Sequence, residues 1–304
     1  MNRRWRAILM LIAVMTLWGS TFVMTKDVIV AVPPLTLAFL RVAIGFVVLL
    51  PLAYRRLLNQ PPPRPPLPWR DLFTMGFIGV AFYYGVFNLG LAHTSASQGA
   101  LVQSSIPAMT ALVAMLWLRE PATRIRTAGI VLSVIGVLVI FSGSPIDRSA
   151  ASPVLGNALV FVSVIAWGVY TSYAKRCAHI DALILTAGVI GAGALFLLPC
   201  ALLELRGQSL PMLNATQWIE VFILGAGASG LAYMLYNLAL QDIDASQAGV
   251  FANLIPVVGV FSGIVLLGDP LSLRAIIGGL IVMAGVWVTG SERGTRGAAP
   301  AAAG

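Results

Sequence analysis

The chain of 304 residues is 59% hydrophobic and only 10% charged, and it carries a formal net charge of +8. Soluble domains carry about 25% charged residues, and a soluble fold of this length has too little interior to hide so much apolar side chain. The composition therefore excludes an ordinary soluble protein and predicts a membrane protein. The basic residues form no face or signature typical of nucleic-acid binding, so we expect no nucleic-acid partner.

In chain order, turn-forming or charged breaks separate ten apolar windows, each close to the roughly 20 residues that a membrane helix needs. We therefore predict an all-α polytopic membrane protein with ten transmembrane helices. The first window follows MNRRWR as in a signal peptide, but it continues past Trp18 without a small-x-small cleavage site, which favours an uncleaved span. The windows are residues 6–26, 34–54, 71–92, 95–118, 124–142, 153–174, 181–203, 215–239, 244–267 and 273–290.

Three further features of the sequence carry information. Residues 55–70 read RRLLNQPPPRPPLPWR, which is typical of a polyproline-type surface linker. The C-terminal tail at 292–304 ends in GAAPAAAG and is predicted to be disordered. Cys177 and Cys200 belong to no CxxC or Cys/His cluster, so we expect no metal site, no disulfide framework and no cofactor.

The distribution of positive charge predicts the orientation. With a cytoplasmic N-terminus, 14 of the 19 Lys and Arg residues fall in cytoplasmic segments or at the cytoplasmic ends of windows, 4 fall outside, and only Arg41 lies well within a window. This bias follows the positive-inside rule. We therefore expect both termini in the cytoplasm and, in the absence of targeting signals, a cell (inner) membrane of a bacterium.

The second half of the chain repeats the first at an interval of 149 residues. ASQGALVQSSIP from Ala96 returns as ASQAGVFANLIP from Ala245, and no gap is needed on either side. We interpret the match as an internal duplication, with a first five-helix repeat at 1–143, a connecting loop at 144–150 and a second five-helix repeat at 151–291. The matched pairs include Trp18/Trp167, Lys26/Lys175, Tyr84/Tyr233, Asn88/Asn237, Pro107/Pro256, Gly129/Gly278 and Gly136/Gly285.

Each repeat contains five spans, an odd number, so the second copy enters the membrane from the opposite face. Inverted repeats of this kind are typical of secondary transporters, which bind substrate near the midplane between their halves. The duplication therefore predicts a central cavity and alternating access. A receptor or membrane enzyme has less need for this symmetry, although some channels share it.

Several motifs also resemble one family. The ten spans, the duplication, LWGSTFV in the first window, FLR in the second and the succession ASQ, IP and EP resemble the drug/metabolite transporter superfamily. Within it, the chain is similar to EamA-type exporters such as the YddG amino-acid exporters, with Asp269-Pro270 in place of the second Glu-Pro. The resemblance implies two five-helix halves around a central cavity and export of metabolites, including aromatic or other neutral amino acids.

The candidate substrate-binding residues follow the repeat. Tyr84 and Asn88 share one helix face, and their counterparts repeat it, so these side chains either contact substrate or hydrogen-bond neighbouring helices. Trp18 and its counterpart lie too deep for an interfacial belt and either line the path or pack. The predicted set is Trp18, Tyr83, Tyr84, Asn88, Gln98, Trp167, Tyr170, Tyr233, Asn237, Gln247 and Asn253.

Helix ends, prolines and one arginine add to this picture. Ser97-Gln98 and Ser246-Gln247 open two spans, where the serines are natural N-caps and the positive helix ends can attract a carboxylate. Pro107 and Pro256 lie mid-span and are predicted hinges. Arg41, whose counterpart is Ile190, either has a structural partner or attracts a carboxylate.

Missing chemistry narrows the function. No Asp or Glu lies deep in a window, so we expect facilitative or weakly coupled transport without a buried carboxylate. No HExxH, nucleophile elbow, Walker sequence or carboxylate pair is present, so we expect no enzyme activity. The sequence predicts an exporter of small organic metabolites, with a permease for other metabolites or drugs, or a channel-like pore, as alternatives. Expected partners are a small-molecule substrate and the lipid bilayer, in a monomer or homodimer without an obligatory protein partner.

Overall fold

The computed structural model describes residues 3–59, 67–117, 123–142, 152–206, 212–243, 251–269 and 271–291. In these ranges the chain forms helices and turns and no strand. The connecting loop at 144–150, the tail at 292–304, the proline-rich stretch at 60–66 and Gln247 lie outside the described residues. The all-α prediction is confirmed for the part of the chain that is described.

The helices of the first half are α1 (Arg3–Val28), α2 (Pro34–Leu58), α3 (Trp69–Gly76), the π-helix η1 (Phe77–Phe82), α4 (Tyr83–His93), α5 (Ala96–Gln103), α6 (Ile106–Trp117) and α7 (Arg124–Ser142). Those of the second half are α8 (Pro153–Arg176), α9 (Ala182–Glu204), α10 (Ala215–Phe222), the π-helix η2 (Ile223–Leu231), α11 (Ala232–Asp242), α13 (Leu254–Leu267) and α14 (Leu273–Ser291).

These helices join into one helical span for each predicted window. The elements α3, η1 and α4 run on without interruption, as do α10, η2 and α11, whereas a short turn joins α5 to α6. Seven spans are long and apolar enough to cross a membrane, and three shorter apolar helices lie at Thr127–Ile140, Leu254–Leu267 and Leu273–Val288. The described residues thus supply a helix for each of the ten windows.

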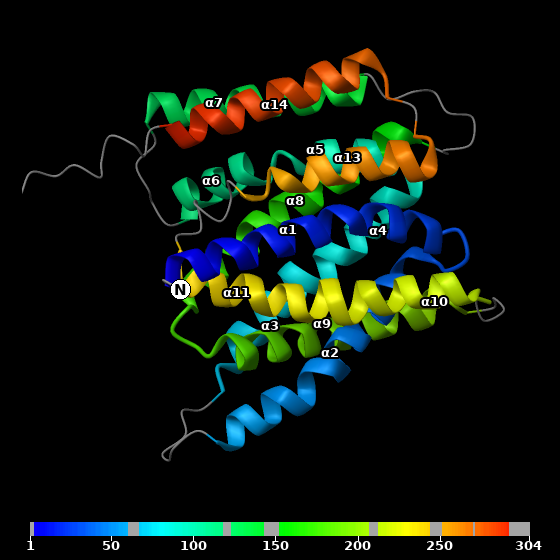
Figure 1. The fold of residues 1–304 in the computed structure, drawn as a ribbon, viewed down its shortest axis with the longest axis vertical. Coiled ribbons are helices and arrows are strands. Elements are labelled where there is room, and N and C mark those ends of the chain that lie inside the picture. Colours follow the sequence, from blue (N-terminus) through cyan, green and yellow to red (C-terminus); the bar gives the residue numbers. More distant parts are fainter. Residues whose placement is uncertain are drawn as a thin grey trace, which may run out of the picture.

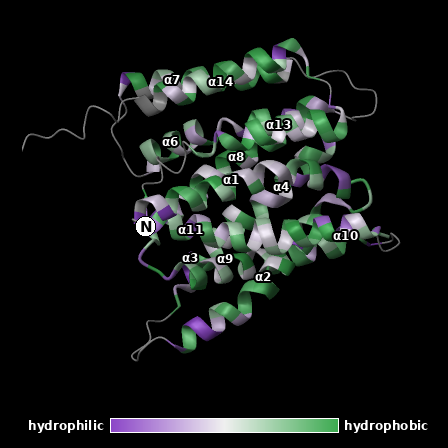
Figure 2. Ribbon diagram, in the orientation of Figure 1, coloured by the Kyte–Doolittle hydropathy of each residue, from purple (hydrophilic) through white to green (hydrophobic). Residues whose placement is uncertain are grey.

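The surface of the bundle suits a bilayer. Hydrophilic residues gather towards the two ends of the helices, while their middle parts are hydrophobic (Figure 2). Large apolar side chains point outward, including Leu280 at 62% and Trp287 at 75% exposure on α14. Such a surface is costly in water and favourable against lipid tails.

Two pairs of helices that correspond in the repeat pack against each other. The most extensive contacts between helices join α7 to α14 and α2 to α9. Most of the other helices lie between these two pairs (Figure 1). The start of α1 and the end of α14 lie at the same side of the bundle in this view. An even number of crossings has this result.

The spans that contain Pro107 and Pro256 are interrupted by a turn rather than kinked at the proline. A turn at Ser104–Ser105 separates α5 from α6, and a turn at Ala252–Asn253 precedes α13. Pro107 and Pro256 are therefore in the first turn of α6 and of α13, where a missing backbone N–H removes no helical hydrogen bond. The two turns are 148 residues apart, one position short of the repeat interval, and the hinge role of the prolines stays a prediction.

The π-helices also recur at matched positions. η1 ends at Phe82 and η2 at Leu231, again 149 residues apart. π-helical turns inside α-helices are frequently found at functional sites. Here they end immediately before the segments that carry Tyr84 and Tyr233.

Candidate functional site

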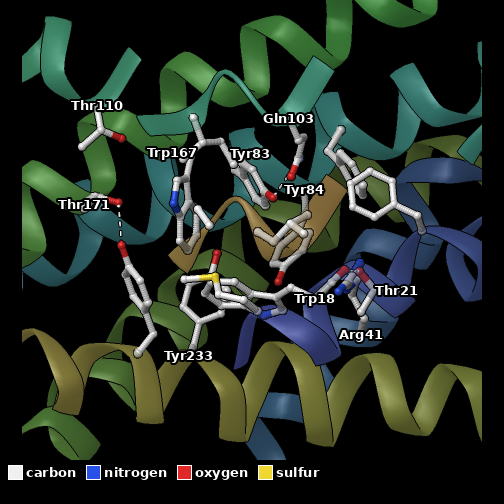
Figure 3. A pocket seen from close by; sticks show the side chains of 17 residues that line it. Trp18, Thr21, Arg41, Tyr83, Tyr84, Gln103, Thr110, Trp167, Thr171 and Tyr233 are labelled. Carbon is white, nitrogen blue, oxygen red and sulfur yellow. Dashed lines mark hydrogen bonds between the residues drawn. The ribbon is translucent and has the colours of Figure 1, made fainter. Parts of the chain in front are cut away.

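A buried cluster of aromatic rings lies where the two halves meet. The rings of Trp18 and Trp167 are T-shaped at 5.1 Å between centroids, and Tyr84 and Tyr233 lie 6.1 Å apart. Trp18 also contacts Tyr233 at 5.6 Å. Each of the first two pairs joins residues 149 positions apart, so both repeats contribute the same residue types to one cluster (Figure 3).

The polar atoms of the cluster bond to the π-helices. Trp18 Nε1 donates to the carbonyl oxygen of Ala228 in η2 at 3.0 Å, and the Tyr233 hydroxyl donates to that of Gly79 in η1 at 2.9 Å. Gly79 and Ala228 are again 149 residues apart. Hydrogen bonds from these polar atoms hold the rings in fixed orientations, so the cluster is an ordered wall.

This cluster lines a cavity of about 30 Å³. That volume suits a few water molecules, whereas ligand pockets usually measure about 300–1,000 Å³. The cavity in this structure is therefore too small for an organic molecule of the size of an amino acid. The lining residues are Met15, Trp18, Thr21, Phe22, Arg41, Tyr83, Tyr84, Phe87, Gln103, Ile106, Thr110, Trp167, Thr171, Tyr233, Tyr236, Ala252 and Ile255.

The predicted site residues divide into two groups. Those that line the cavity are Trp18, Tyr83, Tyr84, Trp167 and Tyr233. Those that the structure places away from its walls are Asn88, Gln98, Tyr170, Asn237 and Asn253, while Gln247 is not among the described residues.

The polar residues away from the cavity mostly join helices. Asn237 donates to the Tyr170 hydroxyl at 3.0 Å and to Thr186 Oγ1 at 2.9 Å, so it ties α11 to α8 and α9. Asn88 donates to the carbonyl oxygen of Pro34 at 3.1 Å, at the start of α2. These contacts fit the packing alternative that the sequence left open for the two asparagines.

Other lining residues were absent from the predicted set. Thr21, Thr171 and Tyr236 lie three or four positions after Trp18, Trp167 and Tyr233. Residues at this spacing share a helix face, so extending each aromatic seed by one turn finds them. Gln103 contacts the Tyr83 hydroxyl at 3.2 Å, and its polar character at mid-depth is the available signal.

One lysine in each half joins two helix ends. Lys26 Nζ donates to the carbonyl oxygens of Leu91 at 2.9 Å and Thr94 at 2.7 Å. In the second half, Lys175 Nζ donates to those of Leu240 at 3.0 Å and Ile243 at 3.2 Å, each 149 positions later. An ammonium suits the partial negative charge of a helix C-terminus. We call the two ends of the bundle the Lys26 end and the Lys175 end.

A polar network closes the Lys26 end between the halves. Thr94 Oγ1 donates to Asn157 Oδ1 at 2.7 Å, and Asn157 Nδ2 donates to Gln98 Oε1 at 2.9 Å. The carboxylate of Asp269 accepts from the backbone N–H of Ser97 at 2.8 Å. Gln98 is therefore part of an interhelical contact at the end of the span.

The expectation that Ser97 caps its helix is corrected. The N-cap of α5 is Ser95, whose side chain accepts from the Gln98 N–H at 3.2 Å. Ser97 lies two residues later, inside the helix, where its backbone N–H donates to the Asp269 carboxylate. The sequence offers two serines two positions apart, and only the backbone geometry separates them.

A second, larger hollow of about 300 Å³ lies between α2, α3 and α9. Its walls are apolar, from Phe46, Leu50, Trp69, Leu72 and Leu195 among others. It lacks the few convergent polar groups that orient a ligand. The aromatic cavity is the better candidate site.

A bundle of apolar helices around a small, partly polar central cavity is an architecture typical of membrane transport proteins. The chain belongs to the EamA-like transporter family, which matches it twice, at residues 5–142 and 154–291. The two matches cover nearly all of both halves, and the family and its relatives are transporters rather than enzymes.

Similar proteins are found in archaea and bacteria. An uncharacterized transporter of Archaeoglobus fulgidus is 29% identical over 287 residues, which cover 91% of this chain and 96% of that protein. A probable amino-acid metabolite efflux pump of Salmonella typhimurium is 27% identical over 288 residues, covering 90% and 91%. A solved crystal structure shares the fold with a TM-score of 0.68 at 21% identity, over 97% of this chain and 99% of the other.

Proposed function

We propose that the protein exports small organic metabolites, with aromatic and other neutral amino acids as the favoured class, by alternating access between two inverted five-helix repeats. The observation that carries this proposal is the central cavity, whose aromatic wall takes matched residues from both halves. Rings on several sides provide stacking and edge contacts for an apolar or aromatic side chain. The relative from Salmonella typhimurium, a probable amino-acid metabolite efflux pump, supports amino-acid metabolites as substrates without specifying their side chains.

Matched contacts support the inverted-repeat part of the proposal. The Lys26 and Lys175 bonds and the ends of the two π-helices each recur at an interval of 149 residues. If the halves face opposite ways, equivalent contacts hold opposite ends of the bundle. Exchanging the conformations of the halves then opens the cavity to the other side.

The small volume of the cavity favours a carrier over the channel-like alternative. A space of about 30 Å³ does not admit an amino acid, so helices must move before a substrate binds. The absence of acidic side chains from the described lining residues favours facilitative or weakly coupled transport. A continuously open pore needs neither property.

Counterflow in proteoliposomes tests the function. Vesicles are preloaded with unlabelled amino acid, and labelled tryptophan, phenylalanine, threonine and methionine are supplied separately outside. We expect saturable uptake of the aromatic amino acids that unlabelled substrate on the other side accelerates. Uptake without such acceleration contradicts alternating access, and no uptake of any of the four contradicts amino-acid export.

For orientation, we propose an inner-membrane protein with both termini in the cytoplasm. Met212, 93% exposed between α9 and α10, is then outside, whereas Asn59, just after α2, is inside. In a Cys200→Ala background, Met212→Cys should react with an impermeant maleimide on intact cells and Asn59→Cys should not. Burial raises the pKa of the remaining Cys177 thiol to about 11, so it contributes little background at pH 7.

A further inference from the structure

Arg41 on α2 is a buried cation in the wall of the central cavity. Its side chain is 1% exposed, and its guanidinium lies 4.1 Å from the centre of the Tyr84 ring. Nε donates to Ser229 Oγ at 3.0 Å. Nη1 is buried and has no hydrogen-bond acceptor among the described residues. One edge of the guanidinium is therefore bound, and another donor is left open.

No carboxylate of the described chain pairs with this arginine. The ion pairs found in the described ranges join Arg6 to Asp242 and Arg56 to Asp181, both on side chains near the Lys175 end. None of the residues that line the cavity is acidic. A buried charge without an anion is unfavourable, so its retention needs a reason.

The repeat argues that the reason is not architectural. The position equivalent to Arg41 is Ile190, which is also buried and packs in the hydrophobic core. An apolar residue thus satisfies the fold at this place in the second half. The arginine gives the cavity one cationic side, and Figure 3 shows it beside Thr21, away from Thr110 and Thr171.

We propose that Arg41 binds the carboxylate of the transported molecule, and that the substrates are aromatic or bulky apolar carboxylic acids, amino acids included. This inference rests on the proposed function and names the group that the site recognises. A guanidinium offers parallel N–H donors that match the two oxygens of a carboxylate. With the carboxylate at Arg41, a ring can contact Trp18, Trp167 and Tyr233, which form the neighbouring wall.

The cavity makes a further distinction between the two charges of an amino acid. An ammonium group in the cavity meets no carboxylate, because the described lining residues include none, and it shares the space with the positively charged Arg41. The carboxylate is therefore the required group, and the ammonium is dispensable.

Four compounds with one ring system test this on the unmodified protein. Unlabelled phenylalanine, 3-phenylpropionate, phenylalaninamide and phenethylamine compete against counterflow of labelled phenylalanine and, separately, of labelled 3-phenylpropionate. We expect the two carboxylates to compete, and the amide and the amine to be roughly 10- to 100-fold weaker, as for loss of a hydrogen-bonded charge. Competition by all four at similar concentrations overturns the proposal and leaves the proposed function standing. If neither labelled phenylalanine nor labelled 3-phenylpropionate shows saturable uptake, both this proposal and the proposed function are wrong.

Substitution then assigns the effect to Arg41. In Arg41→Gln we expect the preference for phenylalanine over phenylalaninamide to disappear, and in Arg41→Lys we expect part of it to return. Ser229→Ala is the matched control, since it removes the Nε partner and leaves the charge in place. If Arg41→Gln keeps the full preference, the proposal is wrong. A variant that fails to fold leaves the decision to the compound series, which needs no mutation.

Discussion

The two halves of the molecule supply matched aromatic and lysine residues, and they differ at one charged residue in the wall of the central cavity. Trp18 and Trp167 meet ring to ring, and Lys26 and Lys175 make equivalent bonds to helix ends. By contrast, Arg41 corresponds to Ile190. A symmetric transporter needs both halves to move alike, but a substrate with one charged end needs a cavity that is not symmetric.

The ends of the bundle differ in the same way. Asn157 links Thr94 and Gln98 at the Lys26 end, whereas the residue equivalent to Asn157 in the first half is Ile8. Matched contacts thus hold the helices together in both halves, while unmatched polar residues make the contacts at one end of the bundle differ from those at the other. Changes at matched positions should have equal effects in both halves, and changes at unmatched positions should not.

The largest effect is expected where α7 packs on α14. A Cβ on Gly136 would lie 2.6 Å from the backbone nitrogen of Val282, and one on Gly285 would lie 2.6 Å from that of Ser133. Backbone atoms cannot turn aside, so Gly136→Ala and Gly285→Ala should each lower the free energy of unfolding by about 3 kcal/mol or more. Denaturation in detergent micelles measures this.

The control for the glycines is Gly85→Ala, whose new Cβ finds its nearest neighbour at 3.4 Å, a Leu35 methyl group. It should be neutral or slightly stabilising, because alanine is the better helix former. A large difference between the two interface variants would show that the contact is not equivalent from its two sides.

The next effect concerns the two lysines. Lys26→Met and Lys175→Met each remove two charge-assisted hydrogen bonds to carbonyl oxygens, and each should destabilise the protein by about 2 kcal/mol. The same unfolding measurement applies, with Lys→Arg at both positions as the charge-preserving control. Equal losses support matched mechanical roles, and a loss at one position alone contradicts them.

Hydropathy and self-comparison suffice for much of this architecture. The ten windows became helices because their length and apolar character leave a membrane segment few alternatives, and the 149-residue interval reappears in contacts such as Lys26 to Thr94. Aromatic residues of the cavity such as Trp18 and Tyr84 could be predicted from their position within a window and from the repeat. Hydropathy, window length and the position of a residue within its window can all be read from a single segment.

What sequence reasoning missed depends on neighbours. Asn88 and Asn237 share a face with cavity tyrosines, yet each is taken by a backbone or side-chain partner on an adjacent helix. The π-helices change the register of their spans, and no local signal announced them. Arg41 could be located but not interpreted, because its lack of an anion is visible only once the surrounding helices are placed.

The aromatic pair comes next in expected size. Trp18→Ala and Trp167→Ala should each reduce the rate of aromatic amino-acid counterflow about tenfold, or ~1.4 kcal/mol, since each removes a large part of the shared wall. Trp287→Ala is the control, because this ring is 75% exposed on the lipid-facing side of α14. Unchanged transport in both cavity variants would remove the central cavity as the site.

The smallest effect tests the unmatched network. Asn157→Ile places the type of residue found at the equivalent Ile8 into the second half and leaves Thr94 and Gln98 without its two hydrogen bonds. It should lower stability by about 1 kcal/mol, the usual net worth of a buried hydrogen bond with partial rearrangement. Gln241→Ala, which removes one exposed bond to the carbonyl oxygen of Ile180, should change stability by less than about 0.5 kcal/mol. Because this network, within the described residues, joins the halves at the Lys26 end, its loss should favour opening there. With Thr25→Cys as a buried reporter next to Lys26, maleimide labelling should be faster with Asn157→Ile than without it. Labelling that is no faster would mean that the matched contacts alone, Lys26 above all, hold this end closed.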